Sequence, residues 1–401
     1  MGIKEGLDHT LDLLMSCGNP HHQLRTIHIA GTNGKGSTSS MLASILRSAG
    51  YRVGLYTSPH LIKFNERITI NEQLISDDEI ILFLDKYHDE IDRIQSTFFE
   101  TTTVMALNYF YQKKVDIAII EVGLGGRLDS TNVISPQITA ITPISLDHQH
   151  ILGNDILKIA KEKSGIIKRN TPLVLSNQDQ EVYSCIHNIA EKMNSSVIDI
   201  GNISDINLTS SGTEFKSKWG KFNSPLIGYH QSQNSTTAIA IAKTFDSKIN
   251  KQTIQDGLNQ TKWKGRLQKI SNNLPIYYDV AHNAKGINVT IESIVSIYNS
   301  LPHIVISIKG DKDIELISNA LIDQYKSLII TGSKQLDLMS ANQLFKYFKK
   351  NSNHMNIQMV DPLENSFDIL IDRVKSSHNP GIIMGSHYLA KAVFDKFGIF
   401  K

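Results

Sequence analysis

Residues 27–38 read I-H-I-A-G-T-N-G-K-G-S-T, an apolar run followed by a glycine-rich turn that carries one lysine and two hydroxyl side chains. Apolar residues then recur at helical spacing, at Met41, Leu42, Ile45 and Leu46. A strand that enters a glycine turn from which a helix leaves directs backbone N–H groups and a helix N-terminus at phosphate. The stretch therefore predicts a β/α fold whose loop binds a nucleoside triphosphate.

The loop departs from the strict G-x-x-x-x-G-K-[ST] pattern at two points. Ile29 stands where the first glycine belongs, and Gly36 separates Lys35 from Ser37. The alternative interpretation is a glycine-rich loop without a ligand, but the lysine and both flanking elements favour phosphate. We expect nucleotide contacts along the turn and the first helical residues: Thr32, Asn33, Gly34, Lys35, Gly36, Ser37 and Thr38.

The composition is that of an ordinary soluble enzyme and argues against several other classes of protein. The 401 residues contain 41 Lys and Arg against 39 Asp and Glu, without a dense basic block, so no nucleic acid partner is expected. The sequence has neither the roughly 20 apolar residues of a membrane span nor the apolar region of a signal peptide at its start. Cys17 and Cys185 form no metal-binding spacing. We expect a cytoplasmic monomer with reduced thiols and no membrane partner.

Short apolar runs alternate with helical patterns along the chain, which is typical of βαβ units around a parallel sheet. The first set of predicted strands is Thr26–Ala30, Val53–Thr57, Val115–Val122 and Ile138–Pro143. The second set follows Arg266 and is Ile276–Val280, Ile304–Ile308, Leu328–Thr331, Ile357–Val360 and Ile382–Met384. We predict an α/β protein with two domains: residues 1–266 form a P-loop ATPase-type domain with a mainly parallel sheet, and residues 267–401 form a Rossmann-like, doubly wound domain.

Local patterns predict two helix starts and one irregular segment. Ser76-x-x-Glu79 has the form of a capping box. Asn154 or Asp155 is expected to cap a helix that stops at Gly165. Residues 197–220 lose helical periodicity and predict either short antiparallel strands or an irregular insertion.

Three side chains outside the loop are candidates for chemistry. Glu121 ends an apolar strand, and an acid at the carboxyl end of a parallel strand beside a phosphate loop typically holds Mg²⁺. His148 follows the next strand. From the sequence pattern alone, this histidine could equally be a metal ligand or a structural residue. The pattern makes Lys163 a solvated helical lysine, as it does Lys158 and Lys161.

Several blocks carry a family resemblance. A-G-T-N-G-K-G-S-T resembles the loop of folylpolyglutamate synthase and dihydrofolate synthase, members of the Mur-ligase superfamily. Further blocks agree in the same order: T-S-P-H-L (57–61), F-N-E-R-I (64–68), T-F-F-E (97–100), E-V-G-L-G-G-R-L-D-S-T-N (121–132), L-D-H-Q (146–149), E-K-S-G-I (162–166), W-K-G-R (263–266), D-V-A-H-N (279–283) and G-D-K-D (310–313). The blocks span nearly the whole chain.

The resemblance implies ATP as a substrate and two Mg²⁺ sites. It implies that the residues matching Mg²⁺ ligands are Ser58, Glu121 and His148, and that Lys163 carries a carbamate that supports the second ion. A carbamate forms on an uncharged amine, which burial provides by lowering the lysine pKa. The implied catalytic residues are Lys35, His148, Lys163 and Arg266, and the implied nucleotide contacts beyond the loop are Asn234, Arg266, Asp279 and His282.

The resemblance also implies the substrates. Arg67, Phe99 and Glu100 match the folate side of the family, and Lys309, Asp311 and Ser386 match the region of the incoming L-glutamate. Relatives tend to read G-x-x-P-G-L-x-R where this chain has Glu5 and His9 in place of the proline and the arginine. Use of dihydropteroate in addition to folates therefore rests on fewer matching residues than use of ATP.

We expect an ATP-dependent ligase that phosphorylates the carboxylate of a folate and joins L-glutamate to it through an acyl phosphate. Two alternatives are weighed. A Mur-type ligase acting on a cell-wall precursor conflicts with the T-F-F-E and E-K-S-G-I blocks. A nucleotide-binding regulatory protein that has lost catalysis conflicts with retention of Lys35, Glu121, His148 and Lys163.

Overall fold

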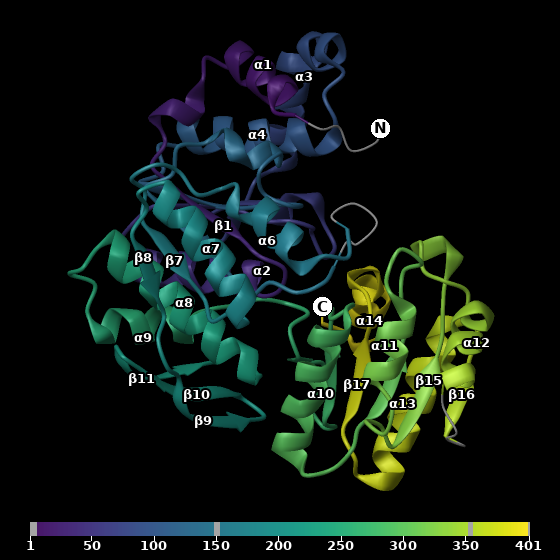
Figure 1. Cartoon of the computed structure of the whole chain (residues 1–401). Coiled ribbons are helices and arrows are strands. Elements are labelled where there is room, and N and C mark those ends of the chain that lie inside the picture. Colours follow the sequence, from purple (N-terminus) through teal and green to yellow (C-terminus); the bar gives the residue numbers. More distant parts are fainter. Residues whose placement is uncertain (1–5, 148–152, 352–355, 400–401) are drawn as a thin grey trace. The chain divides into compact units, whose positions relative to one another are not determined.

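The computed structural model describes residues 6–147, 153–351 and 356–399 (Figure 1). Its contacts divide the chain into two compact units. The first unit contains residues 1–204, 215–223 and 233–261, and the second contains residues 205–214, 224–232 and 262–401. The second unit thus takes two short segments from before residue 266. Assignment of 1–266 and 267–401 as functional domains remains a prediction.

The first unit is built on an eight-stranded sheet with the order β4-β3-β2-β5-β1-β6-β7-β8. The strands from β2 to β8 in this order run parallel, and β3 and β4 are antiparallel additions at one edge. The central strand β1 is buried along its whole length, as its apolar sequence predicts. The bounds are β1 Thr26–Ala30, β2 Val53–Tyr56, β3 Ile68–Ile70, β4 Gln73–Leu74, β5 Ile117–Glu121, β6 Ile138–Ile141, β7 Leu173–Leu175 and β8 Val197–Asp199.

The helices of the first unit follow the strands in sequence. Their bounds are α1 Asp8–Ser16, α2 Lys35–Ser48, α3 Asp77–Ile94, α4 Phe98–Gln112, α6 Ile156–Ser164, α7 Gln180–Lys192, α8 Tyr229–Phe245 and α9 Lys251–Asn259. Strands β9 Ser204–Thr209, β10 Gly212–Ser217 and β11 Gly220–Ser224 form a separate sheet with the order β11-β10-β9. Strands rather than an irregular insertion therefore occupy most of residues 197–220.

The predicted helix starts agree with the structure in one case and differ in part in the other. Asp155 caps α6 through the N–H groups of Leu157 and Lys158, and Gly165 is its C-cap. Ser76 Oγ accepts the N–H of Glu79 at 3.2 Å. The reciprocal bond of a capping box is absent, because the Glu79 carboxylate pairs with Lys113 Nζ at 2.5 Å. The prediction of a full capping box at this position is wrong.

The second unit is built on a six-stranded sheet with the order β12-β13-β17-β14-β15-β16. Five strands run parallel and β12 is antiparallel. Its strands are β12 Gln268–Lys269, β13 Ile276–Asp279, β14 His303–Ile306, β15 Ser327–Ile330, β16 Ile357–Met359 and β17 Gly381–Met384. Its helices are α10 Ala284–Tyr298, α11 Ile314–Ala320, α12 Ala341–Asn351, α13 Leu363–Ser377 and α14 Ala390–Phe397.

Helices α10, α11 and α12 share one apolar core with the strands of this second sheet. Helix α13 packs on β14, β15 and β17 outside that core cluster and also contacts α14. Helices thus cover both faces, and the predicted doubly wound α/β architecture is confirmed. Among the described helices of the whole chain, none is long and apolar enough to cross a membrane.

A buried histidine in β1 makes the stability of the fold sensitive to acid. His28 is fully buried, its Nε2 lies 2.8 Å from Thr131 Oγ1, and burial lowers its pKa to about 3. Below the ordinary pKa of 6.5 the unfolded chain takes up a proton that the folded chain does not. The stabilisation is therefore complete above pH 6.5 and is lost progressively as the pH falls towards 3.

Replacing His28 by asparagine tests this dependence. Between pH 6 and pH 4 the free energy of unfolding of the parent is expected to fall more steeply, by about 1.4 kcal/mol per pH unit, than that of His28→Asn. Urea unfolding at several pH values measures both slopes, so the loss of stability from the substitution itself does not enter the comparison. Equal slopes would show that His28 does not carry this dependence.

Candidate active site

The predicted phosphate loop connects β1 to α2 and is held in place by the segment that follows the neighbouring strand β6. The N–H groups of Thr32 and Asn33 both bond to the carbonyl oxygen of Pro143, at 3.0 and 3.1 Å. Thr32 Oγ1 donates to the carbonyl of Ser145 at 3.0 Å, and Asn33 Nδ2 to its hydroxyl at 3.0 Å. The turn is therefore rigidly supported from its side.

Gly34 needs to be glycine for two reasons. Its φ of +88° lies in the left-handed region, where side chains are disfavoured. A Cβ at this position would also collide with the side-chain amide of Asn234, which is buried in α8. The structure thus brings Asn234 against the loop, although the two residues are far apart in sequence. Without a side chain at Gly34, a phosphate group can approach the backbone N–H groups of the loop closely.

Lys35 begins α2 and folds its side chain back over the loop. Its Nζ donates to the carbonyls of Gly31 and Thr32, at 3.1 and 3.4 Å. Ser37 and Thr38 lie buried in the first turn of the same helix. The Thr38 hydroxyl has no hydrogen-bond partner within residues 6–147, 153–351 and 356–399. Helix terminus, ammonium group and free hydroxyl together form a site for an anion.

Glu121 ends β5, the strand beside β1, and is buried. Its Oε2 accepts the backbone N–H of Ser58, the second residue after β2, at 3.3 Å. Because β2, β5 and β1 are adjacent parallel strands, their carboxyl ends place Ser58, Glu121 and the loop at one edge of the sheet. His148 lies outside the described residues.

Lys163 is buried in α6, whereas Lys158 and Lys161 on the same helix are exposed. Desolvation, followed by the positive charge of Lys35, lowers the pKa of Lys163 to about 7, against the opposite influence of Asp147 and Asp129. The local pattern of a solvated lysine is therefore misleading here, whereas the burial that the family resemblance requires for a carbamate is present. At neutral pH this amine is in part uncharged and nucleophilic.

The residues present fit a magnesium site in their chemistry. Mg²⁺ prefers oxygen ligands and commonly uses one or two protein carboxylates together with substrate phosphates. Glu121 supplies a buried carboxylate and Ser58 a hydroxyl, and an uncharged Lys163 could supply carbamate oxygens. Across residues 6–147, 153–351 and 356–399, no group of three or more His, Cys, Asp or Glu side chains is arranged to hold a metal by itself.

The predicted folate-side residues of the first unit lie near the carboxyl ends of β2 and β5. Phe99 packs so closely on Gly123 that a Cβ there would collide with its ring. Arg67 is buried, donates from Nε to His60 Nδ1 at 2.9 Å and lies with Cζ 5.2 Å from the centre of the Phe98 ring.

Glu100 already has a structural task in this region. Its Oε2 accepts the N–H of Thr97 at 2.6 Å and completes a capping box at the start of α4. Its Oε1 lies 3.8 Å from His9 Nδ1. A role for Arg67, Phe99 or Glu100 in substrate binding remains a prediction.

The nucleotide contacts expected in the second unit cluster at the end of β13. Asp279 is buried there and accepts the N–H groups of Leu267 and Ala281, at 2.6 and 2.7 Å. Desolvation raises the pKa of Asp279, and Arg266 opposes that rise. His282 Nδ1 lies 2.9 Å from the carbonyl oxygen of Val280. Asp279 therefore fixes the backbone directly after Arg266, at Leu267, and directly before His282, at Ala281.

The residues expected near glutamate lie after the neighbouring parallel strands β14 and β17. Lys309 Nζ pairs with Asp337 at 2.7 Å and lies 5.5 Å from the centre of the Tyr388 ring. Ser386 is buried, and its hydroxyl accepts the N–H of Tyr388 at 3.2 Å. Asp311 is exposed. The two strands are hydrogen-bonded neighbours, so both segments follow the same edge of the sheet.

Several residues that support this arrangement had no assigned role in the sequence interpretation. Asp129 accepts bonds from Leu124 N–H at 2.8 Å and from Thr131 at 3.0 and 2.5 Å, which fixes the turn after β5. Pro143 and Ser145 hold the loop. Their position just after a strand, the same feature that indicated Glu121 and His148, could have pointed to them from the sequence.

Comparison with known proteins identifies the family. Residues 29–242 match the Mur ligase middle domain. A Bacillus subtilis relative, dihydrofolate synthase/folylpolyglutamate synthase, is 38% identical over 331 residues, which are 78% of this chain and 77% of the relative. A folylpolyglutamate synthase from Lacticaseibacillus casei is 35% identical over 339 residues, which are 80% of this chain and 79% of the relative.

A solved structure agrees with these relatives. Mycobacterium tuberculosis folylpolyglutamate synthase, complexed with ADP and AMPPCP, has a TM-score of 0.91 and 29% identity, and the match covers 98% of this chain and 96% of that one. The phosphate loop, the ordered sequence blocks and these matches agree. The chain belongs to the folylpolyglutamate synthase/dihydrofolate synthase family of Mur ligases.

Proposed function

We propose that this chain is an ATP-dependent ligase that forms an amide between L-glutamate and the carboxylate of a folate. The observation that carries the proposal is the shared sheet edge at which the phosphate loop, Glu121 and Ser58 meet. The relatives named dihydrofolate synthase and folylpolyglutamate synthase, and the relative solved with ADP and AMPPCP, support the same activity.

The reaction proceeds in two displacements. A carboxylate oxygen of the folate attacks the γ-phosphorus of ATP, the bond to the β–γ bridging oxygen breaks, and ADP leaves. The amine of L-glutamate then attacks the acyl carbon, loses a proton and displaces phosphate. Lys35 and the backbone N–H groups of the loop stabilise the charge on the transferred phosphoryl group. Arg266 and Asn234 are proposed to bind the nucleotide, with Asp279 and His282.

Two Mg²⁺ ions, when bound, would neutralise phosphate charge. Ser58 and Glu121 are proposed to hold the first, together with His148. Lys163 is proposed to hold the second. Its uncharged amine would react with carbon dioxide and lose a proton, which gives a carbamate. The low pKa of Lys163 supports this role, because only an uncharged amine reacts.

Dihydropteroate is proposed as a second acceptor. The Bacillus subtilis relative is named for both activities, and an Escherichia coli structure described as FolC in complex with DHPP and ADP has a TM-score of 0.87 and 26% identity, covering 100% of this chain and 94% of that one. Phosphate release from ATP, measured with tetrahydrofolate and with dihydropteroate in the presence of glutamate, distinguishes one activity from two.

Hydroxylamine tests the acyl phosphate. In place of glutamate it should yield a folate hydroxamate, in a reaction that needs both ATP and Mg²⁺. Mass spectrometry of the product detects it. ATP turnover that gives neither hydroxamate nor, with glutamate, an amide would contradict the ligase proposal.

Replacing Arg266 by alanine is expected to lower turnover about 10²-fold, because a guanidinium that binds phosphate oxygens acts where charge develops. The melting temperature is expected to change little, since Arg266 is only half-buried. Lys264→Ala, at an exposed position in the same segment, is the matched control. If Arg266→Ala lost turnover and thermal stability to the same extent, the result would show that Arg266 has a structural role instead.

A further inference from the structure

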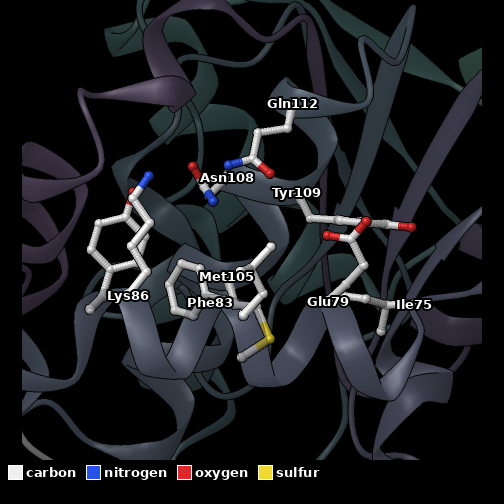
Figure 2. Close-up of a pocket in the computed structure, with 10 residues that line it drawn as sticks. Ile75, Glu79, Phe83, Lys86, Met105, Asn108, Tyr109 and Gln112 are labelled. Atoms are coloured by element: carbon white, nitrogen blue, oxygen red, sulfur yellow. The ribbon is translucent and has the colours of Figure 1, made fainter.

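A cavity of about 270 Å³ lies between α3 and α4, within the first unit (Figure 2). Phe83 and Met105 form its apolar floor, Glu79 and Lys86 lie at its two ends on α3, and Asn108 and Gln112 line it from α4. Helix α4 starts at the active-site edge, where Phe99 contacts Gly123. At 1.5 Å per residue, Asn108 lies roughly 14 Å further along the helix axis. The cavity is therefore separate from the candidate active site.

The decisive side chain of this cavity is Asn108. It is 5% exposed, and its amide forms no hydrogen bond with any residue in the described part of the chain. The amide lines the cavity, so a ligand or a water molecule can reach it, and leucine of similar shape would remove this polar group from the cavity wall. Gln112, one helical turn later, presents a second amide beside it (Figure 2). Two amides facing an apolar floor are the pattern of a ligand site.

One of the two charged groups at the ends is paired. The Glu79 carboxylate pairs with Lys113, whereas Lys86 is exposed and its Nζ lies 5.0 Å from the centre of the Tyr87 ring. A ligand therefore meets no unpaired carboxylate at Glu79, and the Lys86 ammonium lies where water solvates it. The polar groups that remain for a ligand are the side-chain amides of Asn108 and Gln112. Each amide offers a hydrogen-bond donor and an acceptor side by side.

We propose that this cavity binds a small, uncharged, planar heterocycle with a lactam edge, in which N–H stands next to C=O. The Asn108 carbonyl would accept the lactam N–H, and its NH₂ group would donate to the lactam oxygen. Phe83 and the Met105 thioether would contact the ring face, a packing that both side chains favour. Because the cavity is smaller than those that hold drug-sized molecules, a bicyclic ring such as an oxopurine or a pterin matches its size.

The proposal is tested by calorimetric titration of the full chain with hypoxanthine, with pterin and with purine, which lacks the lactam. Saturable binding of hypoxanthine or pterin is expected, with purine about tenfold weaker, the effect of one or two neutral hydrogen bonds. Whichever of the two lactams binds identifies the preferred ring. Asn108→Leu should abolish the tenfold preference while keeping glutamate ligation and a melting temperature at least as high as that of the parent.

The folate-side variant Phe99→Ala is the matched control, and lactam binding should persist in it. Loss of binding in Phe99→Ala would place the heterocycle in the active site and overturn the proposal. Three further results would overturn it. They are equal binding of purine and hypoxanthine, an unchanged preference for hypoxanthine over purine in Asn108→Leu, and no saturable binding of either lactam at millimolar concentration. A large drop in the melting temperature of Asn108→Leu would likewise overturn it, because the amide would then serve the fold.

Discussion

Replacing Lys163 by alanine is expected to lower the rate of ATP-dependent glutamate addition by at least about 10³-fold, the scale seen when a group that stabilises transition-state charge is removed. The reason is the loss of the proposed carbamate oxygens, which would hold metal beside the transferred phosphoryl group. The fold should remain intact, because a buried ammonium group stabilises no folded structure by itself. Steady-state turnover and circular dichroism measure the two effects.

Controls separate the carbamate from other roles of Lys163. Lys161→Ala, at an exposed position on the same helix, should keep parental turnover. Formate or acetate should partly restore the turnover of Lys163→Ala, because these anions supply the missing carboxylate oxygens. With ¹³C-labelled bicarbonate, the parent should show a carbamate resonance that the alanine variant lacks. A nucleotide-bound crystal structure with an unmodified Lys163 directed into solvent would contradict the assignment.

The second large effect is expected for Lys35→Met, again about 10³-fold in turnover, with weaker ATP binding. The Lys35 ammonium bonds to the Gly31 and Thr32 carbonyls, so this positive charge lies over the proposed phosphate loop. Removing it also removes a positive charge that lowers the pKa of Lys163, so less of that amine would be uncharged at pH 7.

The double variant Lys35→Met/Lys163→Ala tests whether the two lysines act together. Its loss of turnover should be clearly smaller than the product of the two single losses, because the first substitution already weakens the function of the second residue. Independent, multiplicative losses would show that the two lysines are not coupled. Nucleotide affinity measured by titration separates weaker binding from slower chemistry.

The sequence predicted the features that depend on neighbouring residues and on sheet geometry. The glycine turn, the strand that enters it and the helix that leaves it are local, and parallel strands place their carboxyl ends together. For this reason the loop and Glu121 could be placed before the structure was known, and Ser58 could be added from the resemblance.

Other features depend on partners that are distant in sequence. Lys163 has the local pattern of a surface lysine, and it is buried because the turn after β5 packs against its backbone at Gly126. Glu79 does not complete its capping box because it pairs with Lys113, the residue that follows α4. The cavity beside Asn108 has no sequence signal, since side chains from two separate helices, α3 and α4, line it together. Tertiary packing overrides local pattern in all three cases.

The contact between α6 and the turn after β5 has a consequence for motion. Gly126 and Gly165 each lie so close to the opposite segment that a Cβ would collide with it, Arg127 N–H bonds to the Glu162 carbonyl at 2.8 Å, and their side chains pair at 3.0 Å. Segments joined by backbone contact open together rather than singly. In hydrogen–deuterium exchange, the amides of residues 124–129 and 159–166 should therefore exchange as one cooperative unit, and the proposed metal-binding lysine would be released and recaptured with the turn as a single body.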